Sequence, residues 1–174
     1  YGNNLADEAL EAAFIGLKNA IKYSFLDRGS DERQYCAPGI DLPVCTFCRT
    51  KFGSYPEYHT SEDNFNVVTS DGLQGSFSLI KNIIDSFEIG LYPLIKVLGE
   101  PQLSKRDLYP SISNYHNGIN PSKTRMNIIA YCDSQNSIFE IAKKTNTNLL
   151  KVLSEIQKLK HKGLIEIIDL TQND

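Results

Sequence analysis

The chain has 174 residues, of which 41% are hydrophobic and 22% charged, and its formal net charge is −3. This composition is typical of a soluble globular protein, and no run approaches the roughly 18 consecutive apolar residues of a membrane span, which excludes a membrane protein. The first residues, YGNNLADEAL, carry early acids and no basic or apolar leader region, so we predict no secretory signal and expect a cytoplasmic protein.

The first 33 residues predict a helix, a strand and a loop. Apolar residues recur at helical spacing over 5–20, with Asp7 and Glu8 in the first turn, where the helix dipole favours acids. Residues 23–26 predict a short strand, and the charged stretch DRGSDER predicts the loop at its carboxyl end. In open α/β sheets, sites are built at that end of the strands.

The next segment predicts a second strand and a long helix. Residues 42–49 form an apolar run typical of a buried strand, and the polar, aromatic stretch KFGSYPEYHTSEDN predicts another loop. A helix is predicted over 73–87, with Gly90 just past its end. One face of that helix carries Leu73, Phe77, Ile80, Ile84 and Phe87. The order helix, strand, strand, helix favours an edge portion of a doubly wound α/β sheet.

The last third of the chain predicts a winged helix-turn-helix. Residues 89–120 contain three prolines and have little periodicity, so they predict a connecting arm. The predicted elements after the arm are helices over 125–131, 138–144 and 149–161, the second capped by Asn136 or Ser137, and a strand in LIEIIDL after Gly163. We therefore predict an α/β portion over 1–98, a connecting arm over 99–120 and a small winged helix-turn-helix domain over 121–174.

Basic residues are concentrated in one segment. Residues 121–162 hold 8 Lys/Arg against 3 Asp/Glu, whereas residues 1–120 hold 10 against 15. This positive segment could meet phosphate groups. However, the candidate recognition helix over 149–161 has no Arg for bidentate contacts to guanine. We therefore favour a packing or partner-docking role for the winged helix and do not expect nucleic acid as a partner.

Four cysteines are too few and too scattered for a disulfide scaffold, so we expect them to be reduced. Cys45 and Cys48 form a C-x-x-C, which could be half a zinc site or a redox pair. No second C-x-x-C or histidine pair lies near them in the sequence. We favour strand cysteines that pack as small apolar residues.

Two polar clusters could carry chemistry. His59 lies among Tyr58, Thr60, Glu62 and Asp63, where a neutral imidazole could bind a metal while a nearby carboxylate or hydroxyl fixes its other ring nitrogen. Asp31, Glu32 and Arg33 follow the first predicted strand and could be surface ion pairs or could position a substrate terminus. The other histidines, His116 and His161, are predicted to face solvent.

The two clusters also carry a family resemblance. The segments SDERQYCAPGIDLP and EYHTSEDNF resemble the closing part of the zinc aminopeptidase fold. Together, GSDERQYCAPG, PEYHTSEDN and GEPQLSKRDLYP resemble bacterial aminopeptidase-like proteins that end in a winged helix and are often found among polysaccharide-biosynthesis genes. The resemblance runs from GNNLAD to the end of the chain and covers only the carboxy-terminal part of such a protein.

The resemblance implies roles for these residues. His59 would be the last zinc ligand, Asp63 would support it, and Asp31, Glu32 and Arg33 would line the substrate pocket. The other metal ligands and the general base would lie in an amino-terminal segment that the chain does not contain, so no catalytic residue is assigned here and the chain is expected to be inactive alone. In the complete protein, zinc would polarise the scissile carbonyl of a peptide or other amide and lower the pKa of a bound water.

Two other functions remain open at this stage. The basic helix-turn-helix could belong to a nucleic-acid-binding regulator. The short strand inventory could belong to a scaffold that completes its sheet with another copy or another chain, which would give an oligomer through an exposed sheet edge.

Overall fold

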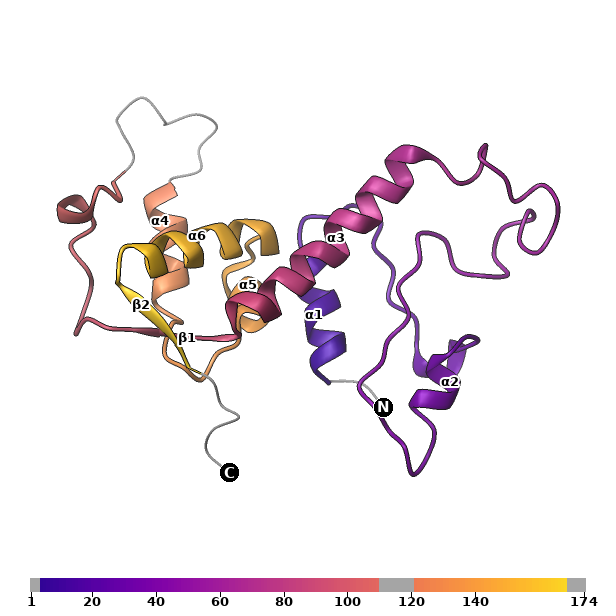
Figure 1. The fold of residues 1–174 in the computed structure, drawn as a ribbon, viewed down its shortest axis with the longest axis horizontal. Helices are drawn as coiled ribbons and strands as arrows, with labels where there is room; N and C mark the ends of the chain where they lie inside the picture. Colours follow the sequence, from indigo (N-terminus) through magenta and orange to yellow (C-terminus); the bar gives the residue numbers. More distant parts are fainter. Residues whose placement is uncertain (1–3, 110–120, 169–174) are drawn as a thin grey trace.

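The computed structural model describes residues 4–109 and 121–168, which fold into a helix-rich molecule with one small sheet (Figure 1). The helices α4, α5 and α6 and the sheet lie at one end, a segment with little regular structure lies at the other, and α3 runs between them (Figure 1). None of the described helices is long and apolar enough to cross a bilayer. The elements in chain order are α1 (Leu5–Ala13), η1 (Phe25–Asp27), α2 (Glu32–Tyr35), α3 (Ser70–Ile89), β1 (Tyr92–Ile95), η2 (Leu103–Arg106), α4 (Pro121–Ile129), α5 (Ile138–Thr145), α6 (Leu149–His161) and β2 (Ile165–Ile168).

Helix α1 begins where the sequence predicts and ends earlier. Its N-cap, Asn4, accepts a hydrogen bond from the backbone N–H of Asp7, and the Asp7 carboxylate accepts one from the Asn4 N–H, which makes a capping box. The predicted helix continues to residue 20, but Gly16 takes the left-handed conformation with φ of +87°. That conformation breaks the helical ladder, so α1 stops at Ala13.

The two strands predicted over 23–26 and 42–49 are wrong. Residues 25–27 form the 3-10 turn η1, in which Ser24 Oγ accepts a hydrogen bond from the Leu26 N–H, and residues 42–48 have no regular structure. An apolar, β-prone run becomes a strand only when a neighbouring strand takes up its backbone hydrogen bonds. Neither segment has such a neighbour within the described residues. The doubly wound sheet is therefore not confirmed, and residues 23–49 do not form the sheet edge on which the expectation of an oligomer rests.

The described sheet belongs to the winged helix. β1 and β2 pair antiparallel, with Tyr92 opposite Ile168 and Ile95 opposite Ile165. The other edge of β1 is held by the 132–134 segment, because the Ile95 N–H donates to the Cys132 carbonyl at 2.8 Å. The sequence predicts a connecting arm without strands over 89–120. The prediction is wrong at Tyr92–Ile95, which form β1. Its sequence, YPLI, contains a buried proline that hides the strand signal.

Gly90 allows α3 to turn directly into β1. It has φ of +95°, and a Cβ at this position would lie 2.4 Å from Cγ2 of Ile167 on β2. Only glycine meets both conditions without strain, because it has no side chain to clash and tolerates positive φ. The end of α3 is thereby fixed against the sheet of the winged helix.

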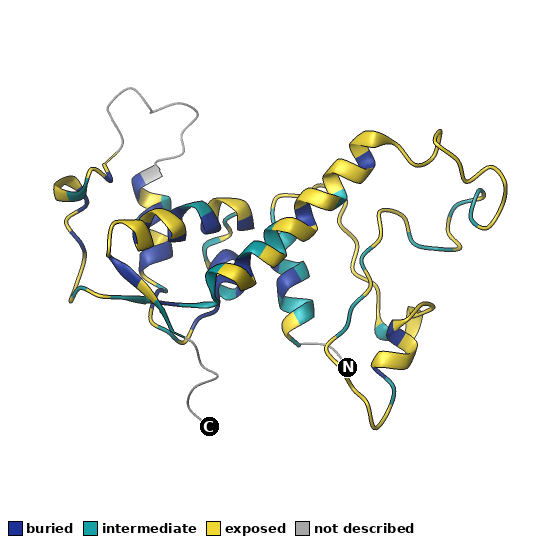
Figure 2. Cartoon of the chain, viewed as in Figure 1, coloured by how far each residue is buried: buried dark blue, intermediate teal, exposed yellow. Residues whose placement is uncertain are grey.

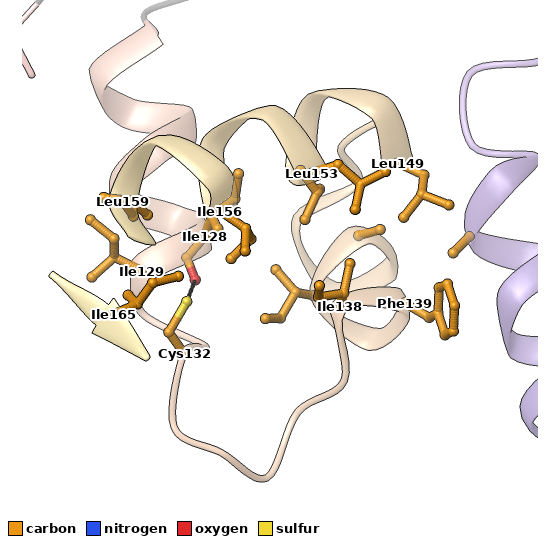
Figure 3. Close-up of a cluster of buried hydrophobic side chains, with 14 of the residues drawn as sticks. Ile128, Ile129, Cys132, Ile138, Phe139, Leu149, Leu153, Ile156, Leu159 and Ile165 are labelled. Atoms are coloured by element: carbon orange, nitrogen blue, oxygen red, sulfur yellow. Dashed lines mark hydrogen bonds between the residues drawn. The ribbon is translucent and has the colours of Figure 1, made fainter. Parts of the chain in front are cut away.

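The predicted helix-turn-helix is confirmed. The N-cap of α5 is Ser137, which forms a capping box with Glu140, and the N-cap of α6 is Asn148, whose side chain accepts from the Lys151 N–H. Gly163, with φ of +66°, follows the end of α6 as predicted. The apolar faces of the three helices meet in a core of fully buried side chains, which includes Ile128, Ile138, Ile156 and Leu159, all labelled in Figure 3.

This core extends beyond the winged helix into the amino-terminal part of the chain. Ala9 and Ala12 of α1 are 2% and 0% exposed and belong to the same buried cluster as α5 and α6. Phe139 lies at the end of the cluster that faces α1 in Figure 3, and its ring also meets that of Phe87 on α3 edge-on, with centroids 5.5 Å apart. Helices α1 and α3 therefore pack on the winged helix and share one core with it.

Candidate functional site

The chain between α1 and α3 carries both predicted site clusters, and most of it is exposed (Figure 2). Only Glu32 and Cys36 are buried between residues 14 and 69. The segment is held by local turns, side-chain hydrogen bonds and ring contacts rather than by a core. Its two ends are fixed because α1 and α3 pack on the winged helix.

Glu32 holds its own loop together. One carboxylate oxygen accepts hydrogen bonds from the backbone N–H groups of Gly29, at 2.7 Å, and Ser30, at 3.0 Å. The other accepts one from the Thr46 hydroxyl at 2.6 Å. Burial alone would raise the pKa of Glu32, but these hydrogen bonds outweigh it and lower the pKa to about 2. The carboxylate is thus ionised and fully engaged within the loop.

Asp31 and Arg33, on either side of Glu32, are exposed. Arg33 Nε donates a hydrogen bond to the Ser30 carbonyl at 3.3 Å, which leaves the rest of its guanidinium in solvent. The Asp31 side chain makes no capping hydrogen bond although the residue stands at the N-cap of α2. Of the three predicted pocket residues, two are therefore available to a ligand and one stabilises the loop.

His59 stands exposed on the second loop. Its φ of +61° is left-handed, which is uncommon outside glycine, although His is among the side chains that adopt it more often. The imidazole stacks on the Tyr58 ring, with centroids 3.9 Å apart and an interplanar angle of 18°. Within the described residues no group hydrogen-bonds to the imidazole, so both ring nitrogens remain open to a ligand.

Asp63 lies near Tyr55 rather than against the imidazole. The Tyr55 hydroxyl donates a hydrogen bond of 3.4 Å to Asp63 Oδ2. Desolvation first, and then the charge of Asp63, raise the pKa of Tyr55 above its usual value. The turn between His59 and Asp63 is shaped by Thr60, whose hydroxyl donates to the Glu57 carbonyl and accepts from the Glu62 N–H.

Aromatic rings link the two loops, a contact that is not predicted from the sequence. A Cβ on Gly29 would lie 2.4 Å from the Phe52 ring, so the first loop passes directly against that ring. The Phe52 ring lies 6.5 Å from the Tyr58 ring, and Tyr58 in turn stacks on His59. We call Phe52, Tyr58 and His59 the aromatic bridge. The density of aromatic residues in KFGSYPEYH was the available signal for it.

The described residues do not form a complete metal site. No group of three or more His, Cys, Asp or Glu side chains within 4–109 and 121–168 is placed to hold a metal ion. A shallow depression beside the second loop is lined by Pro56, Glu57, Thr60, Glu62, Asn64, Asn66 and Val67, and includes neither His59 nor residues 31–33. A catalytic zinc needs three protein ligands, so these residues alone do not fit it.

All four cysteines are free. Cys45 is half-buried, and this burial raises the pKa of its thiol to about 11, whereas Cys48 is exposed. The prediction that both pack in a strand is therefore wrong, because residues 42–48 form no strand. The buried cysteines are Cys36, whose thiol donates to the Val44 carbonyl at 3.2 Å, and Cys132 in the winged-helix core.

The basic residues of the winged helix are largely paired. Lys151 and Lys158 on α6 lie 3.0 Å and 3.4 Å from Oε1 of Glu155, and Lys143 on α5 pairs with Glu11 on α1 at 2.6 Å. Glu11 also pairs with Lys22, and the hydrogen bonds from Lys143 and then Lys22 lower its pKa. The pair between Lys143 and Glu11 joins the helix-turn-helix to α1.

Comparisons with known proteins match two families to successive parts of the chain. Residues 1–90 match the family described as domain of unknown function (DUF4910), and residues 91–167 match a winged helix-turn-helix family, HTH_47. A Clostridium acetobutylicum protein, named for polysaccharide biosynthesis and an aminopeptidase-like domain, is 30% identical over 145 residues, which are 83% of this chain and 33% of the relative.

A solved structure from the same organism, described as that of a peptidase, superposes with a TM-score of 0.68 at 25% identity and covers 96% of this chain and 37% of the solved one. The chain thus spans about a third of the length of these relatives. The resemblance to aminopeptidase-like proteins with a winged helix, over only part of their length, is confirmed. Because the match covers just over half of its length, the chain belongs to the DUF4910 family, and a winged helix-turn-helix follows that domain.

Proposed function

We propose that this chain is the carboxy-terminal part of a zinc-dependent aminopeptidase-like hydrolase and that His59 supplies one of its metal ligands. The observation that carries the proposal is the exposed imidazole of His59, which has no hydrogen-bond partner among the described residues and lies on a loop tied by the aromatic bridge to the loop of Asp31 and Arg33. The aminopeptidase-like name of the relative supports the same chemistry.

The backbone at His59 gives further support. Residues held at positive φ without being glycine store strain, and such residues cluster at functional sites. Stacking on Tyr58 restricts rotation of the imidazole, so the ring is oriented before any ligand arrives. We propose that, in the complete site, the Asp63 carboxylate accepts a hydrogen bond from the ring nitrogen of His59 that does not bind the metal.

The pocket loop suits an amide substrate with a free amine. The exposed carboxylate of Asp31 can meet a substrate ammonium group, and the exposed guanidinium of Arg33 can meet a carboxylate. Glu32 keeps both neighbours in place because its carboxylate fixes the backbone at residues 29 and 30. We propose a peptide or related amide as the substrate of the complete protein.

The metal site would be completed by residues other than those described. One imidazole cannot hold a catalytic zinc ion, because such sites use three protein ligands and keep an open position for water. The chain alone is therefore expected to be inactive, and calorimetric titration should detect no tight, stoichiometric zinc binding. Tight binding by the isolated chain would contradict the assignment of His59 as one ligand of a shared set.

The decisive test is a chimera in which this chain replaces the segment that it matches in the Clostridium acetobutylicum relative. We expect the purified chimera to contain zinc, measured by mass spectrometry, and to hydrolyse leucine 4-nitroanilide. His59→Ala should remove most of the zinc, whereas His161→Ala, at the exposed end of α6, should keep it. Equal zinc content in the two variants would refute the role of His59.

For the winged helix we propose a docking role within the protein. The observation that favours it is the packing of α1 on α5, with Ala9 and Ala12 buried in the winged-helix core. Ala12→Asp would place a charge in that core, so α1 should detach and the winged helix should lose stability with it. Lys18→Asp, at an exposed position, is the control. Unchanged amide signals of α5 in the Ala12→Asp variant would argue against the docking role.

A further inference from the structure

Helix α3 is apolar over two adjacent faces, and only one of them is covered. Its inner face packs on α1 and α6 through Leu79, which is 9% exposed, Ile83, which lies against the core, and the fully buried Ser86. The outer face carries four large apolar residues at spacings of four, three and four. These are Leu73, Phe77, Ile80 and Ile84, with exposed fractions of 58%, 63%, 38% and 52%, and we call them the outer stripe.

A helix with this distribution has room for a second apolar contact. The side of α3 opposite its apolar faces is polar, with Gln74, Lys81 and Asp85, but its apolar surface is wider than the part that packs on α1 and α6. The chain that leads into α3 is apolar and exposed as well, because Phe65 is 90% exposed and Val67 and Val68 are each 40% exposed. The outer side of α3 is yellow in Figure 2, because the described residues leave it exposed.

The chemistry of the stripe favours an apolar protein surface as its partner. Beside the stripe, Gln74 donates to the Ser78 hydroxyl at 3.0 Å, and Lys81 pairs with Asp85 at 2.6 Å. These two polar pairs are therefore satisfied within α3, and the stripe itself carries no charged side chain. A second copy of α3 is a poor fit, because the stripe spans fewer than two heptads and a coiled-coil seam needs about three to four.

The comparisons provide the occupant. The chain superposes over 96% of its length on a structure of which it covers only 37%, so about two thirds of that fold lies outside the matched part. We propose that the outer stripe docks against this remaining aminopeptidase-like body, in the way that the inner face docks against the winged helix. The inference rests on the proposed function for the identity of the body, but it concerns side chains on α3 that take no part in the proposed metal site.

The test compares the isolated chain with the chimera described above, by hydroxyl-radical footprinting and thermal unfolding. In the isolated chain, Phe77 and Ile84 should be labelled strongly and Leu79 weakly. In the chimera, labelling of Phe77 and Ile84 should fall to the level of Leu79. Phe77→Asp should lower the Tm of the chimera and leave that of the isolated chain nearly unchanged, whereas Gln74→Asp, on the same helix, should lower neither.

Several outcomes would overturn the proposal. Labelling of the stripe that is equally strong in the chimera, or equal Tm values for Phe77→Asp and Gln74→Asp in the chimera, would show that the body does not cover it. A dimer of the isolated chain in sedimentation that Phe77→Asp dissolves would assign the stripe to a second copy instead. A chimera that cannot be obtained in folded form would also count against it, because a body that fits the stripe should accept this chain.

The two proposals can fail separately. The His59→Ala chimera should lose zinc and keep full protection of Phe77 and Ile84. Loss of zinc without any protection in the parent chimera would remove the docking inference and leave the metal-ligand assignment intact.

Discussion

Arg125 Nε donates a 2.7 Å hydrogen bond to Oε2 of Glu155, and the two side chains, from α4 and α6, are only 9% and 1% exposed. The guanidinium also donates to the carbonyl of Leu108, so it joins the segment that precedes α4 to α6. Burial alone would raise the pKa of Glu155, but the hydrogen bonds from Arg125 and then Lys151 outweigh it and hold the pKa below its usual value. The pair is therefore ionised at neutral pH.

Removing one partner of this pair should be strongly destabilising. Arg125→Met leaves Glu155 Oε2 and the Leu108 carbonyl without their buried donor. A broken buried pair costs about 3–5 kcal/mol, and because Lys151 and Lys158 still meet Oε1 of Glu155 we expect a loss at the lower end of this range. Urea unfolding followed by circular dichroism measures the change. Lys96→Met breaks the half-exposed pair with Glu166 and should cost less than about 1 kcal/mol, so equal losses in the two variants would contradict this reasoning.

Glu32 should make the stability depend on acid pH. Its pKa is about 2 in the folded chain and near 4.5 without the fold, so its contribution is complete above about pH 4.5 and is lost as the pH falls towards 2. Glu32→Gln should reduce stability at pH 7 and flatten its fall over this window. The measurement is the Tm of both proteins between pH 2 and 7. Parallel curves would mean that Glu32 is not held as described.

Two glycines should respond to alanine in opposite directions. Gly90→Ala forces positive φ on alanine and places its Cβ against Ile167, so we expect a loss of about 1–3 kcal/mol. Gly75 lies within α3 with no atom near the added Cβ, and alanine there should stabilise by about 0.5–1 kcal/mol. Thermal unfolding gives both signs. A neutral Gly90→Ala would show that the junction of α3 and β1 can relax.

The chain should bind duplex DNA weakly. Two α6 lysines, Lys151 and Lys158, already meet Glu155, and Lys143 meets Glu11, so few unpaired cations remain on these helices to displace counterions. Fluorescence anisotropy with a random 20-base-pair duplex at low salt should give no saturable binding at micromolar protein. Tight binding with a steep salt dependence would instead favour a nucleic-acid-binding function.

The sequence predicts the winged helix well because its signals are local. Capping residues such as Ser137 and Asn148 and the apolar periodicity of α5 and α6 agree with the packing that the structure has. β1 escaped prediction because its partner, β2, lies some seventy residues later and Pro93 hides its character. Pairing between distant segments cannot be inferred from the local pattern of one of them.

The amino-terminal part shows the opposite case. The residues of the outer stripe are correctly predicted to share one face of α3, but periodicity does not say which part of a broad apolar surface meets the described core. Apolar runs at 23–26 and 42–49 suggested strands because burial was assumed for them. The role of Glu32 within its loop also depends on backbone N–H groups and on Thr46, fourteen residues away, whose positions only the fold determines.

The shared core of α1, α3 and the winged helix has a thermodynamic consequence. The segment that carries His59 leaves this core after Ile15 and the chain returns to it at Ile83 on α3, so both of its ends are tethered to the same folded unit. A molecule that binds and orders this segment favours the folded state, in which both ends of the segment are held. By linkage it must then raise the unfolding temperature of α4, α5 and α6, although it does not contact them. The unfolding temperature of the winged helix would then show whether a ligand is bound to the segment between α1 and α3.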